Sequence, residues 1–124
     1  MNIQERKFGT VLVVSPAGRI DHATSDEFRH QLETLVENAA KAGNVIVVDL
    51  AGVEYISSAG LRCFMLAAKL AKSLNGTVVI AALQPVVREI FEISRFTLVF
   101  ELYATVRDAI AQKSPPALAD FDAA

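Results

Sequence analysis

The chain has 124 residues, a formal net charge of −2 at pH 7 and 52% hydrophobic residues, which fits one globular domain. Charged residues make up 21% and no run of lysine or arginine occurs, so the composition excludes a disordered chain and argues against binding to nucleic acid or to an anionic membrane surface. No apolar run is long enough for a transmembrane helix, and a single cysteine excludes a disulfide framework. The N-terminus lacks a signal-peptide pattern, so we expect a cytoplasmic protein.

The N-terminal third of the chain predicts a hairpin followed by a helix. Residues 2–8 and the β-branched run 11–14 flank a turn that contains a glycine. Thr24 and Glu27 have the spacing of a capping box, and apolar residues then recur at helical spacing. This pattern ends at Gly43, a residue type that commonly follows the last turn of a helix.

The middle of the chain alternates apolar runs with a helical pattern. Four consecutive aliphatic residues within 44–50 predict a strand that is covered on both faces. A loop over 51–56 leads to a second helix over 57–74, and residues 77–81 have the pattern of another buried strand.

The remaining elements are shorter. A helix over 85–94 begins with a proline, residues 97–100 predict a strand, and a threonine cap begins a last helix over 105–112. Residues 114–124 contain two prolines and predict a flexible C-terminal tail. Strands that alternate with helices predict one α/β domain over residues 1–113, with mostly parallel central strands and an antiparallel pair at the start.

The second helix begins with two serines, Ser57 and Ser58, and two interpretations fit them. A serine at this position caps the helix by accepting a hydrogen bond from a free N–H, which contributes about 1 kcal/mol. The same free N–H groups and the positive end of the helix dipole also stabilise a phosphate. Phosphorylation adds about −1.5 to −2 charges, enough to stop a protein partner from docking there.

The segment 48–61, with the sequence VDLAGVEYISSAGL, resembles the signature of STAS domains, specifically of the bacterial anti-sigma factor antagonists. Residues 18–24 resemble the turn before the first helix of that family, and residues 85–91 resemble its third helix. The resemblance spans about residues 3–112. It implies a STAS-type α/β fold, with a mixed, mostly parallel sheet of four to five strands and about four helices.

The resemblance also implies a mechanism called partner switching. The unphosphorylated antagonist binds an anti-sigma factor, a serine kinase of the histidine-kinase-like ATPase type, and so releases a sigma factor. The kinase phosphorylates the antagonist, the complex dissociates, and a serine phosphatase resets the system. The acceptor of the family falls on Ser58 here, with Ser57 as a second candidate. The chain departs from the family where Ser57 replaces the usual aspartate and Ala59 replaces the usual serine or threonine.

The second helix also predicts a partner surface. One face is expected to be core, and it carries Leu61, Phe64, Met65, Ala68 and Ala71. Two cations point away from that face, with a leucine and Cys63 beside them, which fits either a wide amphipathic helix or a docking patch. A turn aspartate near the acceptor either holds the turn or contacts the partner. The expected partner-binding residues are Asp21, Ser57, Ser58, Arg62, Leu66 and Lys69.

Other functions have weaker support. His22 and His30 lack a ligand-spaced companion, so we expect no metal and no cofactor. Asp49 ends a strand as a receiver-domain phosphoacceptor does, but no acidic pair follows the first strand to bind magnesium. Neither a Gly-x-Ser-x-Gly elbow nor a glycine-rich phosphate loop is present, so we predict no catalytic residues and no enzyme activity. A non-phosphorylated STAS scaffold, as a subunit of a transport-related or other regulatory complex, stays open beside the switch. The oligomeric state is also open between a monomer and a weak dimer.

Overall fold

The computed structural model describes all 124 residues. Its strands are β1 (Ile3–Phe8), β2 (Val11–Pro16), β3 (Gly18–Ile20), β4 (Val45–Asp49), β5 (Val53–Ile56), β6 (Thr77–Ala81) and β7 (Leu102–Tyr103). Its α-helices are α1 (Ser25–Ala42), α2 (Ser58–Ser73), α3 (Pro85–Ile93), α4 (Val106–Lys113) and α5 (Leu118–Ala123). Two short 3₁₀ helices are η1 (Phe96–Leu98) and η2 (Pro115–Ala117).

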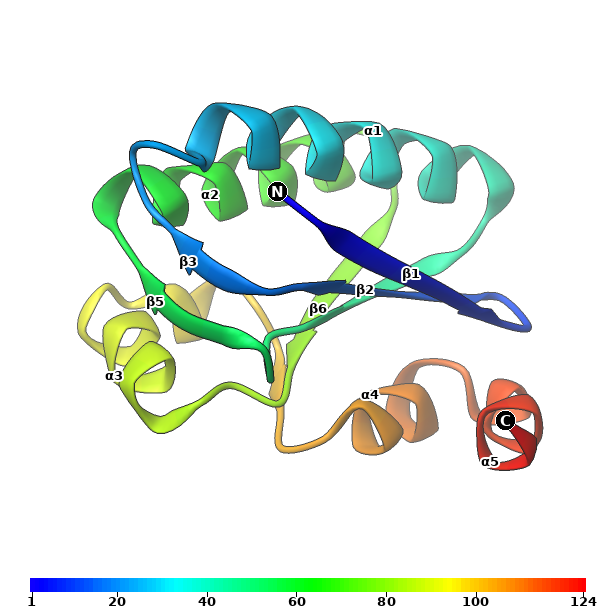
Figure 1. Cartoon of the computed structure of the whole chain (residues 1–124). Coiled ribbons are helices and arrows are strands. Elements are labelled where there is room, and N and C mark those ends of the chain that lie inside the picture. The colour runs from blue at the N-terminus through cyan, green and yellow to red at the C-terminus, as the bar shows by residue number, and fades with distance from the viewer.

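The five-stranded main sheet has the order β1-β2-β4-β6-β7, in which only the β1–β2 pair is antiparallel. Figure 1 shows α1 and α2 on one face of this sheet and α4 and α5 on the other. This arrangement confirms the predicted mixed, mostly parallel α/β fold, with one more helix than expected. No helix in the structure has both the length and the apolar composition needed to cross a bilayer.

The strands β2, β4 and β6 are buried on both faces, which explains their uninterrupted aliphatic runs. Successive residues of a strand point to opposite faces. Each run therefore contributes side chains to two hydrophobic cores, one on each face of the sheet. The larger core lies under α1, α2 and α3 and includes Val14, Val48, Ile80, Phe28, Phe64 and Phe91. The smaller core lies under α4 and η2 and includes Val13, Val47, Val79, Ala109, Ile110 and Ala117.

A second sheet consists of two short parallel strands, β3 and β5, which the sequence did not predict. Residues 51–56 were expected to be a loop, and residues 18–20 were expected to be part of a turn. Each strand has only three or four residues and pairs only with the other, so neither segment carries a long strand pattern. This small sheet is important because it leads directly into the starts of α1 and α2 (Figure 1).

The predicted strand over 97–100 is wrong. Residues 96–98 form η1 instead, and β7 begins only at Leu102. Phe96 and Phe100 are both buried in the larger core. Their ring centroids lie only 6.3 Å apart, a separation that one helical turn allows, whereas four residues of extended strand would span about 13 Å. Arg95, with a φ of 59°, redirects the chain after α3 and makes this turn possible.

Helix ends follow the sequence signals in most places. Gly43 ends α1 with a φ of 73°, and Pro85 is the first residue of α3. The predicted capping box of α1 does not form. Thr24 Oγ1 donates to the carbonyl of Arg19 at 3.0 Å, and the Glu27 carboxylate contacts the N-terminal amine. Thr24 therefore stabilises the turn before the helix rather than the first helical N–H groups.

The C-terminal residues 114–124 are helical in the structure, although their sequence predicts an irregular tail. The two prolines begin η2, and α5 follows it. The Phe121 ring packs edge-on against Phe8 with a centroid distance of 5.1 Å, and Arg107 forms two hydrogen bonds to Asp122. These contacts place the segment against β1 and α4. The domain boundary at residue 113 stays a prediction.

Deletion of residues 114–124 tests this boundary. Loss of the buried Ala117 and of the Phe8–Phe121 contact is expected to lower the free energy of unfolding by about 1–3 kcal/mol. Urea unfolding followed by circular dichroism measures the change. Deletion of only Ala123 and Ala124, which are exposed, is the matched control. An unchanged urea midpoint in the longer deletion would show that the segment is a tail without a role in stability.

Candidate functional site

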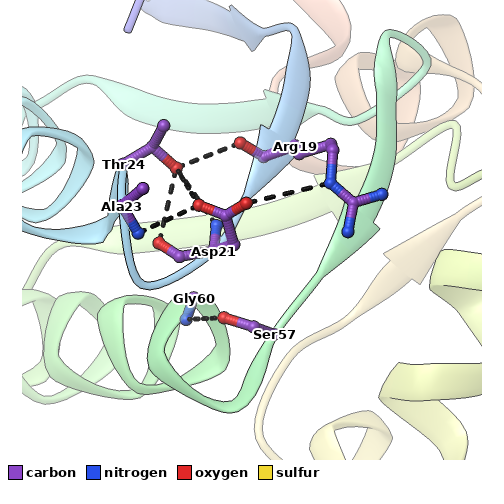
Figure 2. A network of polar contacts seen from close by, with 6 residues as sticks. All are labelled: Arg19, Asp21, Ala23, Thr24, Ser57 and Gly60. Carbon is purple, nitrogen blue, oxygen red and sulfur yellow. Dashed lines mark hydrogen bonds and ion pairs between the residues drawn. The ribbon is translucent and has the colours of Figure 1, made fainter.

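The start of α2 separates the two serines into different roles. Ser57 is the N-cap, and its Oγ accepts a hydrogen bond from the Gly60 N–H at 3.2 Å (Figure 2). Ser58 is the first residue of the helix, is exposed, and makes no side-chain hydrogen bond within the protein. One hydroxyl is therefore used by the fold, and the other is accessible to a modifying enzyme.

Gly60 fixes the position of this helix start. It is buried, and a Cβ atom at this position would lie 2.6 Å from the Ile20 carbonyl oxygen and 2.9 Å from the Ile56 Cγ2. The Ser57 N–H also donates to the Ile20 carbonyl, at 2.9 Å. The end of β3 and the start of α2 are therefore in direct backbone contact, and only glycine allows this approach.

The turn after β3 is organised around Asp21. Its Oδ1 accepts a hydrogen bond from the Ala23 N–H at 3.0 Å, and its own N–H donates to Thr24 Oγ1 at 3.1 Å (Figure 2). The Arg19 Nε lies 3.8 Å from the other carboxylate oxygen, and the Arg19 guanidinium stacks on the Tyr55 ring at 4.5 Å. The Asp21 carboxylate therefore holds the turn, while 25% of its side chain stays exposed.

A shallow groove of about 240 Å³ runs between the N-terminal halves of α1 and α2. It is lined by Ser25, Asp26, Arg29, Ala59, Arg62, Cys63 and Leu66. Cys63 is buried, and its Sγ lies 3.3 Å from the Ser25 carbonyl oxygen. Burial raises the pKa of the Cys63 thiol, and the nearby Arg29 offsets this in part. The thiol is therefore protonated at neutral pH and acts as a packing group.

The burial of Cys63 shows that the predicted orientation of α2 is wrong. The sequence put Leu61, Met65 and Ala68 in the core and Cys63 beside the outward face. In the structure those three residues are half-buried, and the buried residues are Gly60, Cys63, Phe64, Ala67 and Ala71. The helix packs against α1 as well as against the sheet, so its buried face is turned toward α1.

Most of the predicted site residues lie along one helix. Ser58, Arg62 and Lys69 are exposed on α2, and Leu66 is half-buried between the two cations. Asp21 comes from the other loop, which the Ile20 carbonyl ties to the helix start. Sequence reasoning missed Asp26 and Arg29, which complete the groove from α1. Their place there depends on how α1 and α2 pack, and no local pattern encodes that packing.

Comparison with known proteins identifies this arrangement. The family model of the STAS domain matches residues 2–109. The chain belongs to the STAS domain family. The match covers both sheets, α1 to α3 and the first half of α4, and it confirms the resemblance noted from the sequence.

Relatives of this STAS chain carry regulatory names. It is 34% identical over 118 residues to "Putative anti-sigma factor antagonist BtrV" of Bordetella bronchiseptica. This match covers 95% of this chain and 98% of that protein. The anti-sigma factor antagonist SpoIIAA has the same fold in its unphosphorylated form, with a TM-score of 0.71, 18% identity and 90% and 95% of the two chains covered. SpoIIAA has also been solved in a phosphorylated form, with a TM-score of 0.65, 17% identity and 90% and 98% covered.

The fold also occurs inside a much larger protein. The murine anion transporter Slc26a9 matches 85% of this chain with a TM-score of 0.70 and 14% identity, but this match covers only 18% of the transporter. The same fold therefore occurs in proteins of different function. The function of this chain has to be inferred from the residues of its site rather than from the fold.

The close contact at Gly60 leads to a prediction. Gly60→Ala is expected to destabilise the protein by about 2 kcal/mol, because the added methyl group meets backbone atoms that cannot move independently. Gly52→Ala is the control, because its Cβ atom would have ordinary contacts of 3.4 Å. Thermal and urea unfolding measure both changes. Equal stability of the two variants would mean that β3 and α2 separate easily.

Proposed function

We propose that this STAS protein is an anti-sigma factor antagonist whose binding to its partner is controlled by phosphorylation of Ser58. The unphosphorylated protein binds an anti-sigma factor that is also a serine kinase of the histidine-kinase-like ATPase type. Phosphorylation of Ser58 dissociates the complex, and a serine phosphatase restores binding. The protein acts in the cytoplasm through binding and carries out no catalysis of its own.

The observation that carries this proposal is the division of labour between Ser57 and Ser58. The Ser57 hydroxyl is occupied as the cap of α2, whereas the Ser58 hydroxyl is exposed and free. A kinase can therefore reach Ser58 without breaking a hydrogen bond of the fold. Ser57 is the weaker candidate, because its modification would remove a cap worth about 1 kcal/mol.

The surroundings of Ser58 suit a phosphate. The first turn of α2 contains no acidic residue, and the N–H groups of that turn give a favourable dipole. Arg62 lies four residues further along the helix, where an i, i+4 pair can form, and it takes part in no ion pair in the structure. A phosphate would thus be tolerated by the fold while it reverses the charge of the surface.

The proposed partner surface follows α2 from this point. Arg62, Leu66 and Lys69 combine an apolar side chain with two exposed cations, and the groove beside α1 lies next to them. A partner that packs on Leu66 and pairs with the cations would lose affinity once a phosphate of about −1.5 to −2 charges is placed at Ser58. Asp21 adds a contact from the neighbouring loop.

The second candidate is a scaffold subunit without phosphorylation. The occurrence of this fold within the transporter Slc26a9 favours it. The same α2 surface would then bind a constant partner, and Ser58 would only begin a helix. The modification state of Ser58 separates the two functions.

Intact-mass analysis of protein purified from its native host is the decisive test. We expect a fraction of the protein with an added mass of about 80 Da, which is lost in Ser58→Ala. Ser57→Ala should keep the added mass, although it lacks the cap. A consistent absence of the added mass under several growth conditions would favour the scaffold function.

Leu66→Glu tests the proposed surface. The half-buried leucine lies beside the groove, so a carboxylate there should weaken binding to the purified partner kinase at least tenfold, or about 1.4 kcal/mol. The free energy of unfolding should change by less than about 1 kcal/mol. Leu74→Glu, at the opposite end of the same helix, is the matched control and should bind normally. Normal binding by Leu66→Glu, measured by calorimetry, would place the partner elsewhere.

A further inference from the structure

The outer edge of β6 is only partly covered. β6 has five residues, Thr77–Ala81, but β7 has two and pairs only with Ile80 and Ala81. On the side away from β4, Thr77, Val78 and Val79 therefore have no neighbouring strand. An uncovered sheet edge offers backbone groups to another extended chain.

The direction of the backbone groups identifies the free pair. The Ile80 N–H donates to the Glu101 carbonyl at 3.1 Å, and the Ala82 N–H donates to the Tyr103 carbonyl at 3.0 Å, so these residues face β7. Residues two apart in a strand point the same way. The N–H and C=O of Val78 therefore face the same edge, where no strand receives them.

A hollow of about 480 Å³ lies along this edge. It is lined by Met65, Ala68, Lys69 and Lys72 of α2, by Lys113 at the end of α4 and by residues 98–101. The segment 98–101 leaves the path of β7 because Phe96 and Phe100 enter the core. Consequently Leu98 is 81% exposed at the mouth of the hollow.

The charge around the hollow is unbalanced. Three lysines line it, against the single carboxylate of Glu101. That carboxylate is already paired with Lys113, whose hydrogen bond lowers the pKa of Glu101. The chain as a whole has a net charge of −2, so this local excess of positive charge is not a general property of the surface. A ligand with acidic side chains would complement Lys69 and Lys72.

We propose that the hollow beside β6 binds a short, extended, acidic segment of a partner protein, which adds to β6 as a strand. The open edge of three residues is about 10 Å long and gives the segment its backbone hydrogen bonds. Its apolar side chains pack against Leu98 and Met65, and its carboxylates pair with Lys69 and Lys72. Lys69 also belongs to the α2 surface described above, so one partner can reach both. The hollow does not include Ser58, and the proposal holds whether or not Ser58 is phosphorylated.

Nuclear magnetic resonance with a synthetic peptide tests the proposal. The probe is a seven-residue peptide that alternates glutamate and valine, with blocked termini, added to ¹⁵N-labelled full-length protein at low salt. We expect amide shifts concentrated on residues 76–79 and 98–101, with a marked change at Val78. A peptide that alternates lysine and valine should bind at least tenfold more weakly.

Three variants identify the contacts. Val78→Pro removes an N–H that makes no bond within the sheet, together with a half-buried side chain that packs against the larger core. Proline is tolerated on a sheet edge, so peptide binding should be lost while the protein still melts cooperatively. Lys72→Glu should weaken binding about fivefold through charge alone. Lys41→Glu in the last turn of α1 is the matched control and should bind like the original protein.

Several outcomes would overturn the proposal. These are the absence of shifts at millimolar peptide, shifts centred on another surface, and equal binding of the lysine peptide. Shifts of the same residues on raising the concentration of protein alone, together with a larger mass in sedimentation, would assign the edge to a second copy of this chain.

Discussion

The structure depends on the contact between Gly60 and the carbonyl of Ile20. Through it, the small β3–β5 sheet, the Asp21 turn and the first turn of α2 are packed as one unit. Without a side chain at Gly60, the helix start can approach the strand closely enough for the Ser57 N–H to bond to the same carbonyl. Ser57 is then held as the cap, and Ser58 is directed outward. The accessible hydroxyl is a consequence of close packing beneath it.

The sequence predicted the features that have a local cause. Aliphatic runs identified β2, β4 and β6, and the residues that begin or end helices were read correctly at Gly43, Pro85 and Thr105. The features it missed depend on contacts between distant segments. β3 and β5 exist only as a pair, and the orientation of α2 depends on α1. The predicted strand at 97–100 was wrong because a helical turn brings the buried Phe96 and Phe100 together in the core and leaves Leu98 and Val99 exposed.

The candidate site divides in the same way. Ser58 could be named from the motif, because the motif itself places it at the helix start. Its exposure, and the use of Ser57 as the cap, required the structure. The groove residues Asp26 and Arg29 could not be named at all, since they reach the site only through helix packing. The family match, over residues 2–109, identifies the fold and leaves the role of each of these side chains to experiment.

The stacking of Arg19 on Tyr55 also bears on the intrinsic fluorescence of the protein. The chain contains no tryptophan and only two tyrosines, so its near-ultraviolet emission comes from very few rings. Tyr55 lies on β5, which pairs with the strand that leads into the Asp21 turn, and the Tyr103 hydroxyl donates to the Glu101 carboxylate. Each ring therefore has a charged neighbour that is expected to alter its fluorescence, and each lies near a different proposed surface. Tyrosine fluorescence is therefore expected to report the occupation of either surface without an added label.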